Sequence, residues 1–108
     1  MLKNRKRRKD RNHLIYVITN VLTNEQYVGL TGMGVSGSAK KTLHRRMQKH
    51  LQRALSENKN WGLCDALRTY GAECFVYGLL EVVRGKLDAH QRELELIREH
   101  SPVLNTFR

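Results

Sequence analysis

One glutamate lies on the apolar side of the last helix that the sequence predicts, over residues 87–100. At about 100° per residue, Glu93 shares a side with Ala89 and Leu96, whereas the other two glutamates of this helix fall on the opposite side. A carboxylate held against apolar residues is costly unless it binds a cation, accepts hydrogen bonds or is protonated. Glu93 is therefore predicted to be a metal ligand, with a partly buried ion pair to an arginine as the alternative.

A second pair of unusual positions lies on the helix predicted from Thr42, as its N-cap, to about residue 55. Arg46 and His50 are one turn apart and flank its apolar stripe, which includes Leu43 and Met47. A guanidinium in this position can reach a cleft and bind a scissile phosphate, and the imidazole can bind phosphate or relay a proton. The alternative is a solvated basic helix whose cations only contact phosphates.

Two tyrosines face each other across a predicted hairpin. Tyr16 lies in a strand over residues 14–19 and Tyr27 in a strand over residues 26–30, with turn-forming residues between them. Alternation in the first strand puts Tyr16 on the same face as Leu14 and Ile18. Cross-strand aromatic packing would explain this pair if it stood alone.

The remaining elements complete a small α+β domain. We expect a Gly- and Ser-rich loop over 31–41 and a helix over 61–70 after a break at 58–60. A third strand follows over 74–83 and is expected to be the most buried of the three. The last helix is ended by Ser101 and Pro102. The predicted fold is a three-stranded antiparallel sheet, the N-terminal hairpin plus the third strand, flanked by helices. It occupies residues 14–108 and follows a basic, disordered arm over residues 1–13.

The charge of the chain indicates a polyanionic partner. The net charge is +10 over 108 residues, and the arm alone carries seven Lys and Arg residues against Asp10. This balance favours DNA. The residues expected to contact DNA are Arg5, Arg7, Arg8, Lys40, Lys41, Arg45, Lys49, Arg53 and Asn105. No apolar run is long enough for a membrane helix or a signal peptide, so we expect a soluble cytoplasmic protein of a prokaryotic or phage-infected cell.

The ordered set of motifs resembles the GIY-YIG nuclease module. The two signature motifs correspond to Leu14-Ile15-Tyr16 and Tyr27-Val28-Gly29. They are followed by an arginine on the next helix, a glutamate on a later helix and an asparagine near the C-terminus. The resemblance implies that Tyr16 and Tyr27 are the signature tyrosines, Arg46 the catalytic arginine and His50 a position held by His or Tyr. It also implies that Glu93 binds the metal and that Asn105 is the late asparagine.

Two departures from the family pattern matter. Leu14 replaces the first glycine, and the loop after Leu30 is longer than the minimal pattern, so Arg45 stays as the alternative to Arg46.

The resemblance implies a DNA endonuclease that hydrolyses phosphodiester bonds with one Mg²⁺ or Mn²⁺ ion, of the homing, mobile-element, restriction or repair type. Specificity would come from the arm, the loop, DNA shape, a homodimer or a separate partner. The competing hypothesis is a non-catalytic DNA-binding module that uses the basic arm and the first helix.

Overall fold

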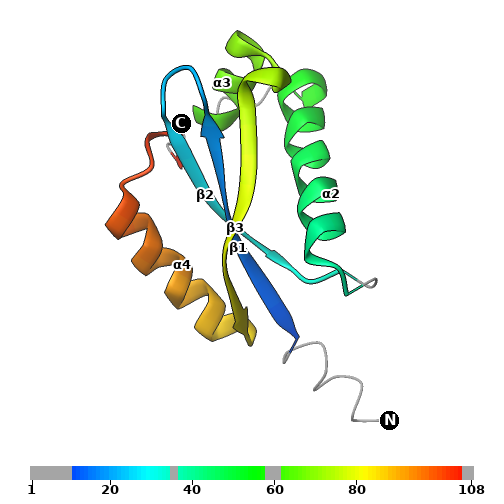
Figure 1. The fold of residues 1–108 in the computed structure, drawn as a ribbon, viewed down its shortest axis with the longest axis vertical. Helices are drawn as coiled ribbons and strands as arrows, with labels where there is room; N and C mark the ends of the chain where they lie inside the picture. Colours follow the sequence, from blue (N-terminus) through cyan, green and yellow to red (C-terminus); the bar gives the residue numbers. More distant parts are fainter. Residues whose placement is uncertain (1–10, 35–36, 58–61, 106–108) are drawn as a thin grey trace.

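The computed structural model describes residues 11–34, 37–57 and 62–105. These residues form three strands, three α-helices and three short helical turns (Figure 1). In chain order they are β1 (Asn12–Asn20), β2 (Gln26–Gly32), α2 (Ala39–Gln52), a π-helical turn η1 (Arg53–Glu57), α3 (Gly62–Tyr70), a 3-10 turn η2 (Ala72–Cys74), β3 (Phe75–Arg84), α4 (Lys86–His100) and a 3-10 turn η3 (Val103–Asn105).

The three strands form one antiparallel sheet in the order β2-β1-β3, as the sequence predicts. Figure 1 shows α2 and α4 on either side of this sheet. The alternation of β1 explains the arrangement: Leu14, Tyr16 and Ile18 enter the core under α2 and α3, and Ile15 enters a second core with Leu96 of α4. The sheet is therefore covered on both faces, and its central strand is β1.

The prediction that the third strand is the most buried is wrong. β3 is an edge strand whose burial pattern is mostly exposed, and Val76, Leu79 and Val82 are 43–54% exposed. Ile15 of β1, by contrast, is completely buried. An apolar run in the sequence predicts a strand but does not predict its position in the sheet. β1 is the most buried strand because it has a strand on each side and helices over both faces.

The start of α2 also differs from the prediction. Its N-cap is Ser38, whose hydroxyl accepts a hydrogen bond from the Lys41 N–H at 3.2 Å. Thr42, the predicted cap, lies buried in the first turn, where its hydroxyl donates to the Ser38 carbonyl at 2.8 Å and accepts from the Gly34 N–H at 3.0 Å. The loop is therefore shorter than predicted, and Lys40 and Lys41 lie on the helix.

Several predictions fall on residues outside the described ranges. These are most of the basic arm (1–10), part of the Gly-rich loop (35–36), the helix break and first residue of the next helix (58–61), and the end of the tail (106–108). Within the described ranges, β1 begins at Asn12, two residues before the predicted strand. None of the helices in these ranges combines the length and apolar composition needed to cross a membrane.

Candidate active site

Tyr16 lies in the middle of β1 and is almost completely buried. Its neighbour across the hairpin is Gly29 of β2. A Cβ atom on Gly29 would lie 2.5 Å from the Oη and Cζ atoms of Tyr16 and 2.8 Å from the ring of Tyr27. Only a glycine at this position leaves room for the phenol of Tyr16 to lie across β2. The position of the signature tyrosine therefore depends on the signature glycine.

The Tyr16 hydroxyl meets two side chains of α2. Its oxygen is 2.8 Å from Nε2 of His50, and it accepts a hydrogen bond from Nε of Arg46 at 3.3 Å. Arg46 and His50 reach the same atom because they are four residues apart on one face of the helix. Tyr27 packs beside them, with its ring centroid 5.3 Å from that of His50 and 6.3 Å from that of Tyr16.

Burial sets the protonation states of this group. It lowers the pKa of His50 to about 4, and the nearby charges of Arg46 and Arg53 act in the same direction, so the imidazole is neutral at neutral pH. Burial raises the pKa of Tyr16, although the adjacent Arg46 opposes the rise. Burial and the neighbouring Tyr16 also raise the pKa of Tyr27. A neutral imidazole thus lies against a protonated phenol.

Glu93 enters the same region from α4. Its side chain is 19% exposed and lines an open cleft together with Tyr27 and Arg46. Burial raises the pKa of Glu93. Within the described ranges its charged neighbour is His90, whose Nδ1 lies 3.8 Å from Oε1 of Glu93. The negative charge of Glu93 also contributes to raising the pKa of both tyrosines, so the carboxylate lies near them.

A divalent ion fits this carboxylate but would be held by few protein atoms. Among the residues that the structure describes, no group of three or more His, Cys, Asp or Glu side chains could hold a metal. Glu93 would therefore be the protein ligand, with water and a phosphate oxygen completing the shell. Mg²⁺ suits such a site, because it commonly keeps several waters and takes only one or two carboxylates.

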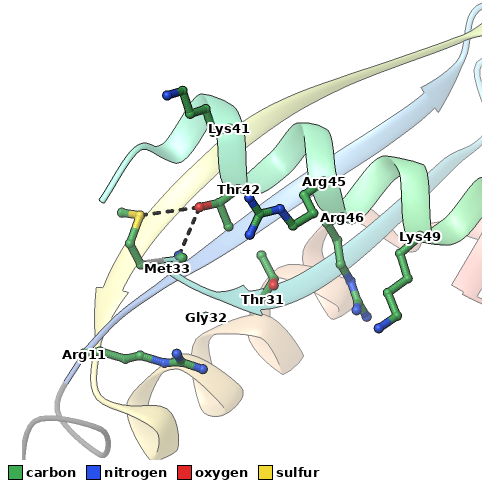
Figure 2. A pocket seen from close by; sticks show the side chains of 10 residues that line it. Arg11, Thr31, Gly32, Met33, Lys41, Thr42, Arg45, Arg46 and Lys49 are labelled. Carbon is green, nitrogen blue, oxygen red and sulfur yellow. Dashed lines mark hydrogen bonds between the residues drawn. The ribbon is translucent and has the colours of Figure 1, made fainter. Parts of the chain in front are cut away.

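A basic groove adjoins the cleft (Figure 2). Five cationic side chains line it, from the end of β2 to α2, and the described residues around it include no acidic one. These cations are Arg11, Lys41, Arg45, Arg46 and Lys49. Arg11, Thr31, Gly32 and Arg46 line both hollows, so the groove and the cleft are adjacent.

The structure brings only some of the predicted DNA-binding residues together. Lys41, Arg45 and Lys49 line the groove, whereas Lys40 is exposed in the first turn of α2 and Arg53 lies on the η1 turn. Arg5, Arg7 and Arg8 lie outside the described residues. Arg11 was not predicted as a site residue, because the sequence shows it only as one more charge of the arm.

Asn105 lies at the outer edge of β2. Its Oδ1 accepts a hydrogen bond from the Val28 N–H at 2.8 Å, and its Nδ2 donates to the Val28 carbonyl at 2.8 Å. Both ends of the amide are thus engaged with the backbone between Tyr27 and Gly29. This contact supports a bracing role rather than a DNA contact for Asn105.

A phenol, a guanidinium and an imidazole that meet beside a carboxylate and a cationic groove are typical of an enzyme that cleaves nucleic acid. The sequence matches the model of the GIY-YIG catalytic domain over residues 12–108, so the chain belongs to this family and is an endonuclease of that type.

Solved structures of one homing endonuclease show the same fold. The catalytic domain of the homing endonuclease I-TevI is 26% identical, with a TM-score of 0.62, over 88% of this chain and 95% of that chain. A mutant of the catalytic domain of the intron endonuclease I-TevI is 22% identical, with a TM-score of 0.68, over 90% of this chain and 92% of that chain. A comparison with curated proteins found no significant match.

Proposed function

We propose that the chain is a metal-dependent DNA endonuclease whose reaction takes place between Tyr16 and Glu93. The observation that carries the proposal is the Tyr16 hydroxyl, which contacts both His50 and Arg46 beside a cleft lined by Glu93. A DNA-binding surface needs cations alone. It does not need a half-buried carboxylate opposite them, and this argues against the non-catalytic alternative.

The residues on β1 and α2 activate the attacking water. The Tyr16 hydroxyl orients the water. As the water attacks phosphorus and the bond from phosphorus to the leaving oxygen breaks, a proton passes from the water to the Tyr16 oxygen while the Tyr16 proton passes to Nε2 of His50. The leaving oxygen takes its proton from solvent. The raised pKa of Tyr16 disfavours a free phenolate, so its proton leaves only as another arrives. The lowered pKa of His50 keeps the imidazole neutral, so a ring nitrogen is free to accept that proton. Tyr27 packs against both rings and fixes their positions.

Arg46 and Glu93 act on the phosphate. The guanidinium of Arg46 stabilises the negative charge that builds on the phosphate oxygens. Glu93 holds the divalent ion, Mg²⁺ or Mn²⁺, which would supply positive charge at the phosphate and at the leaving oxygen when bound. Asn105 keeps Tyr27 and Gly29 in place through the backbone of Val28.

The biological setting that we propose is homing or another mobile-element reaction, since the solved relatives are named as a homing and an intron endonuclease. Restriction and repair remain open uses of the same chemistry. The place of action that we propose is the cytoplasm of a prokaryotic or phage-infected cell. A second copy of the chain or a separate partner would add target specificity.

Incubation of the purified protein with supercoiled plasmid in Mg²⁺ or in EDTA tests the proposal. The parent should cut in Mg²⁺ and not in EDTA, and Glu93→Ala should cut at least about 100-fold more slowly. Glu99→Ala, which removes an exposed carboxylate of the same helix, is the matched control and should cut normally. The metal role is wrong if Glu93→Ala cuts at the parent rate, and a parent that retains DNA but never cuts it would favour the binding module.

A further inference from the structure

Arg11 is anchored at the point where the chain enters the sheet. Its backbone carbonyl accepts hydrogen bonds from the Gly85 N–H at 3.1 Å and from Nδ1 of His13 at 3.0 Å. The residue therefore has a fixed backbone directly before β1, although the sequence groups it with the basic arm.

The side chain of Arg11 lies flat against β2. A Cβ atom on Gly32 would lie 2.6 Å from the guanidinium carbon of Arg11 and 2.7 Å from its Nε. Gly32 is the last residue of β2, and its backbone is in a conformation open to other amino acids. The glycine thus leaves the space that the guanidinium fills.

This guanidinium lies at the junction of the catalytic cleft and the basic groove. It lines both hollows, and Figure 2 shows it extending toward Thr31 and the arginines of α2. Within the described ranges no acidic partner is found for it, unlike Arg92, which pairs with Glu81 and Glu95. Arg11 is exposed and faces other cations, so this surface attracts an anion, and a phosphate matches the planar donors of the guanidinium.

We propose that Arg11, seated on Gly32, binds a DNA phosphate adjacent to the scissile one. The inference rests on the proposed function, because it places the scissile phosphate at Arg46. Arg11 and Arg46 both line the cleft and the groove, so a strand that passes from one hollow to the other passes both arginines, whereas Arg45 and Lys41 line the groove alone. Arg11 therefore sets the path of the cleaved strand, and Gly32 sets the position of Arg11.

Binding of a short fluorescein-labelled duplex by the full chain in EDTA, over a series of salt concentrations, tests this inference. Arg11→Gln should raise Kd about tenfold and reduce the slope of log K against log salt by about 0.9, the value for one lost phosphate contact. Gly32→Ala should also raise Kd about tenfold, because its methyl group displaces the guanidinium. Gly78→Ala, whose added Cβ meets nothing within 4 Å, should bind like the parent.

The double variant Arg11→Gln with Gly32→Ala separates the two residues. If Gly32 acts only by seating Arg11, the double variant should bind no more than about twofold more weakly than either single variant. Effects that multiply would overturn the seating by Gly32, and parent-like binding by Arg11→Gln would overturn the phosphate contact. Arg11→Lys keeps the charge and is the second variant to test if Arg11→Gln unfolds. It should retain the salt slope of the parent but raise Kd. Parent-like binding by Arg11→Lys would overturn a contact that needs the planar guanidinium.

The binding result does not depend on cleavage. A parent that binds the duplex through Arg11 but never cuts plasmid in Mg²⁺ would overturn the proposed function and leave the Arg11 contact standing. If the parent cuts plasmid and Arg11→Gln binds the duplex normally, the Arg11 contact is overturned and the proposed function stands.

Discussion

Tyr16 owes its position to residues that contribute no functional group to the chemistry. Gly29 leaves room for its phenol, and the first signature position, where this chain has Leu14 in place of glycine, is a fully buried core residue. The departure at Leu14 is thus compatible with the site, because its side chain enters the same core as Tyr16. A residue larger than glycine at position 29 would push against the hydroxyl itself.

His50 should make the protein sensitive to acid. Its pKa is about 4 in the folded protein and 6.5 ordinarily, so the unfolded chain binds a proton that the folded protein resists between these values. The contribution of His50 to stability is complete above pH 6.5 and is lost as the pH falls toward 4, by roughly 3 kcal/mol in all.

Urea unfolding of the parent and of His50→Gln across this pH range measures the effect. The difference in unfolding free energy between the two proteins should shrink as the pH falls. His100→Gln, at an exposed histidine, is the control and should follow the parent. Parallel curves for the parent and His50→Gln would show that the buried imidazole is not the acid-sensitive group.

At the residue scale the sequence predicts the site well where local periodicity decides. Arg46 and His50 are four residues apart beside an apolar stripe, and this spacing alone brings them to one face, where the structure places both against Tyr16. Arg11 could not be predicted, because its place depends on contact with Gly32 and Gly85, which are distant in sequence.

At the scale of elements, the η3 turn closes the free edge of β2 through Asn105. Asn105→Ala should leave the N–H and carbonyl of Val28 without these partners and lower the unfolding free energy by about 1–3 kcal/mol. Hydrogen exchange should show faster exchange of the Val28 amide. Asn12→Ala, an exposed change at the start of β1, is the control and should leave that amide protected. Unchanged exchange in Asn105→Ala would mean that the brace is dispensable.

The errors at this scale have a common physical origin. The order of strand and helix types was predicted correctly, because alternation and helical periodicity are local signals. The edge position of β3 depends on which strands pair, and the choice of Ser38 over Thr42 as the N-cap depends on how the loop packs. Neither depends on local sequence alone, so composition and capping preference were insufficient.

At the scale of the whole molecule, the described part of the chain holds one cleft that combines Glu93 with Arg46. One cleft cuts one strand at a time, so a supercoiled plasmid should become nicked before it becomes linear. A gel time course at several protein concentrations checks this order. Linear product that appears without a nicked intermediate would contradict action by single copies and would indicate that two copies cut together.

The charge of the chain is also organised at this scale. The net charge of +10 predicts affinity for polyanions but no location. The structure gathers five cations along a groove that shares part of its lining with the cleft of Glu93, and this arrangement supports the proposed path of the DNA strand.

In the proposed reaction, the Tyr16 hydroxyl, held by His50 and Arg46, activates the attacking water. Single-turnover cleavage of labelled DNA in Mg²⁺ by Tyr16→Phe tests it most directly, because this change removes one oxygen and keeps the ring against Gly29. Tyr77→Phe is the matched control. Tyr77 lies on the exposed strand β3, and its hydroxyl contacts His44 of α2. Tyr16→Phe should cleave at least about 100-fold more slowly than Tyr77→Phe with unchanged DNA binding in EDTA. Cleavage by Tyr16→Phe at the parent rate would show that this hydroxyl does not activate the water.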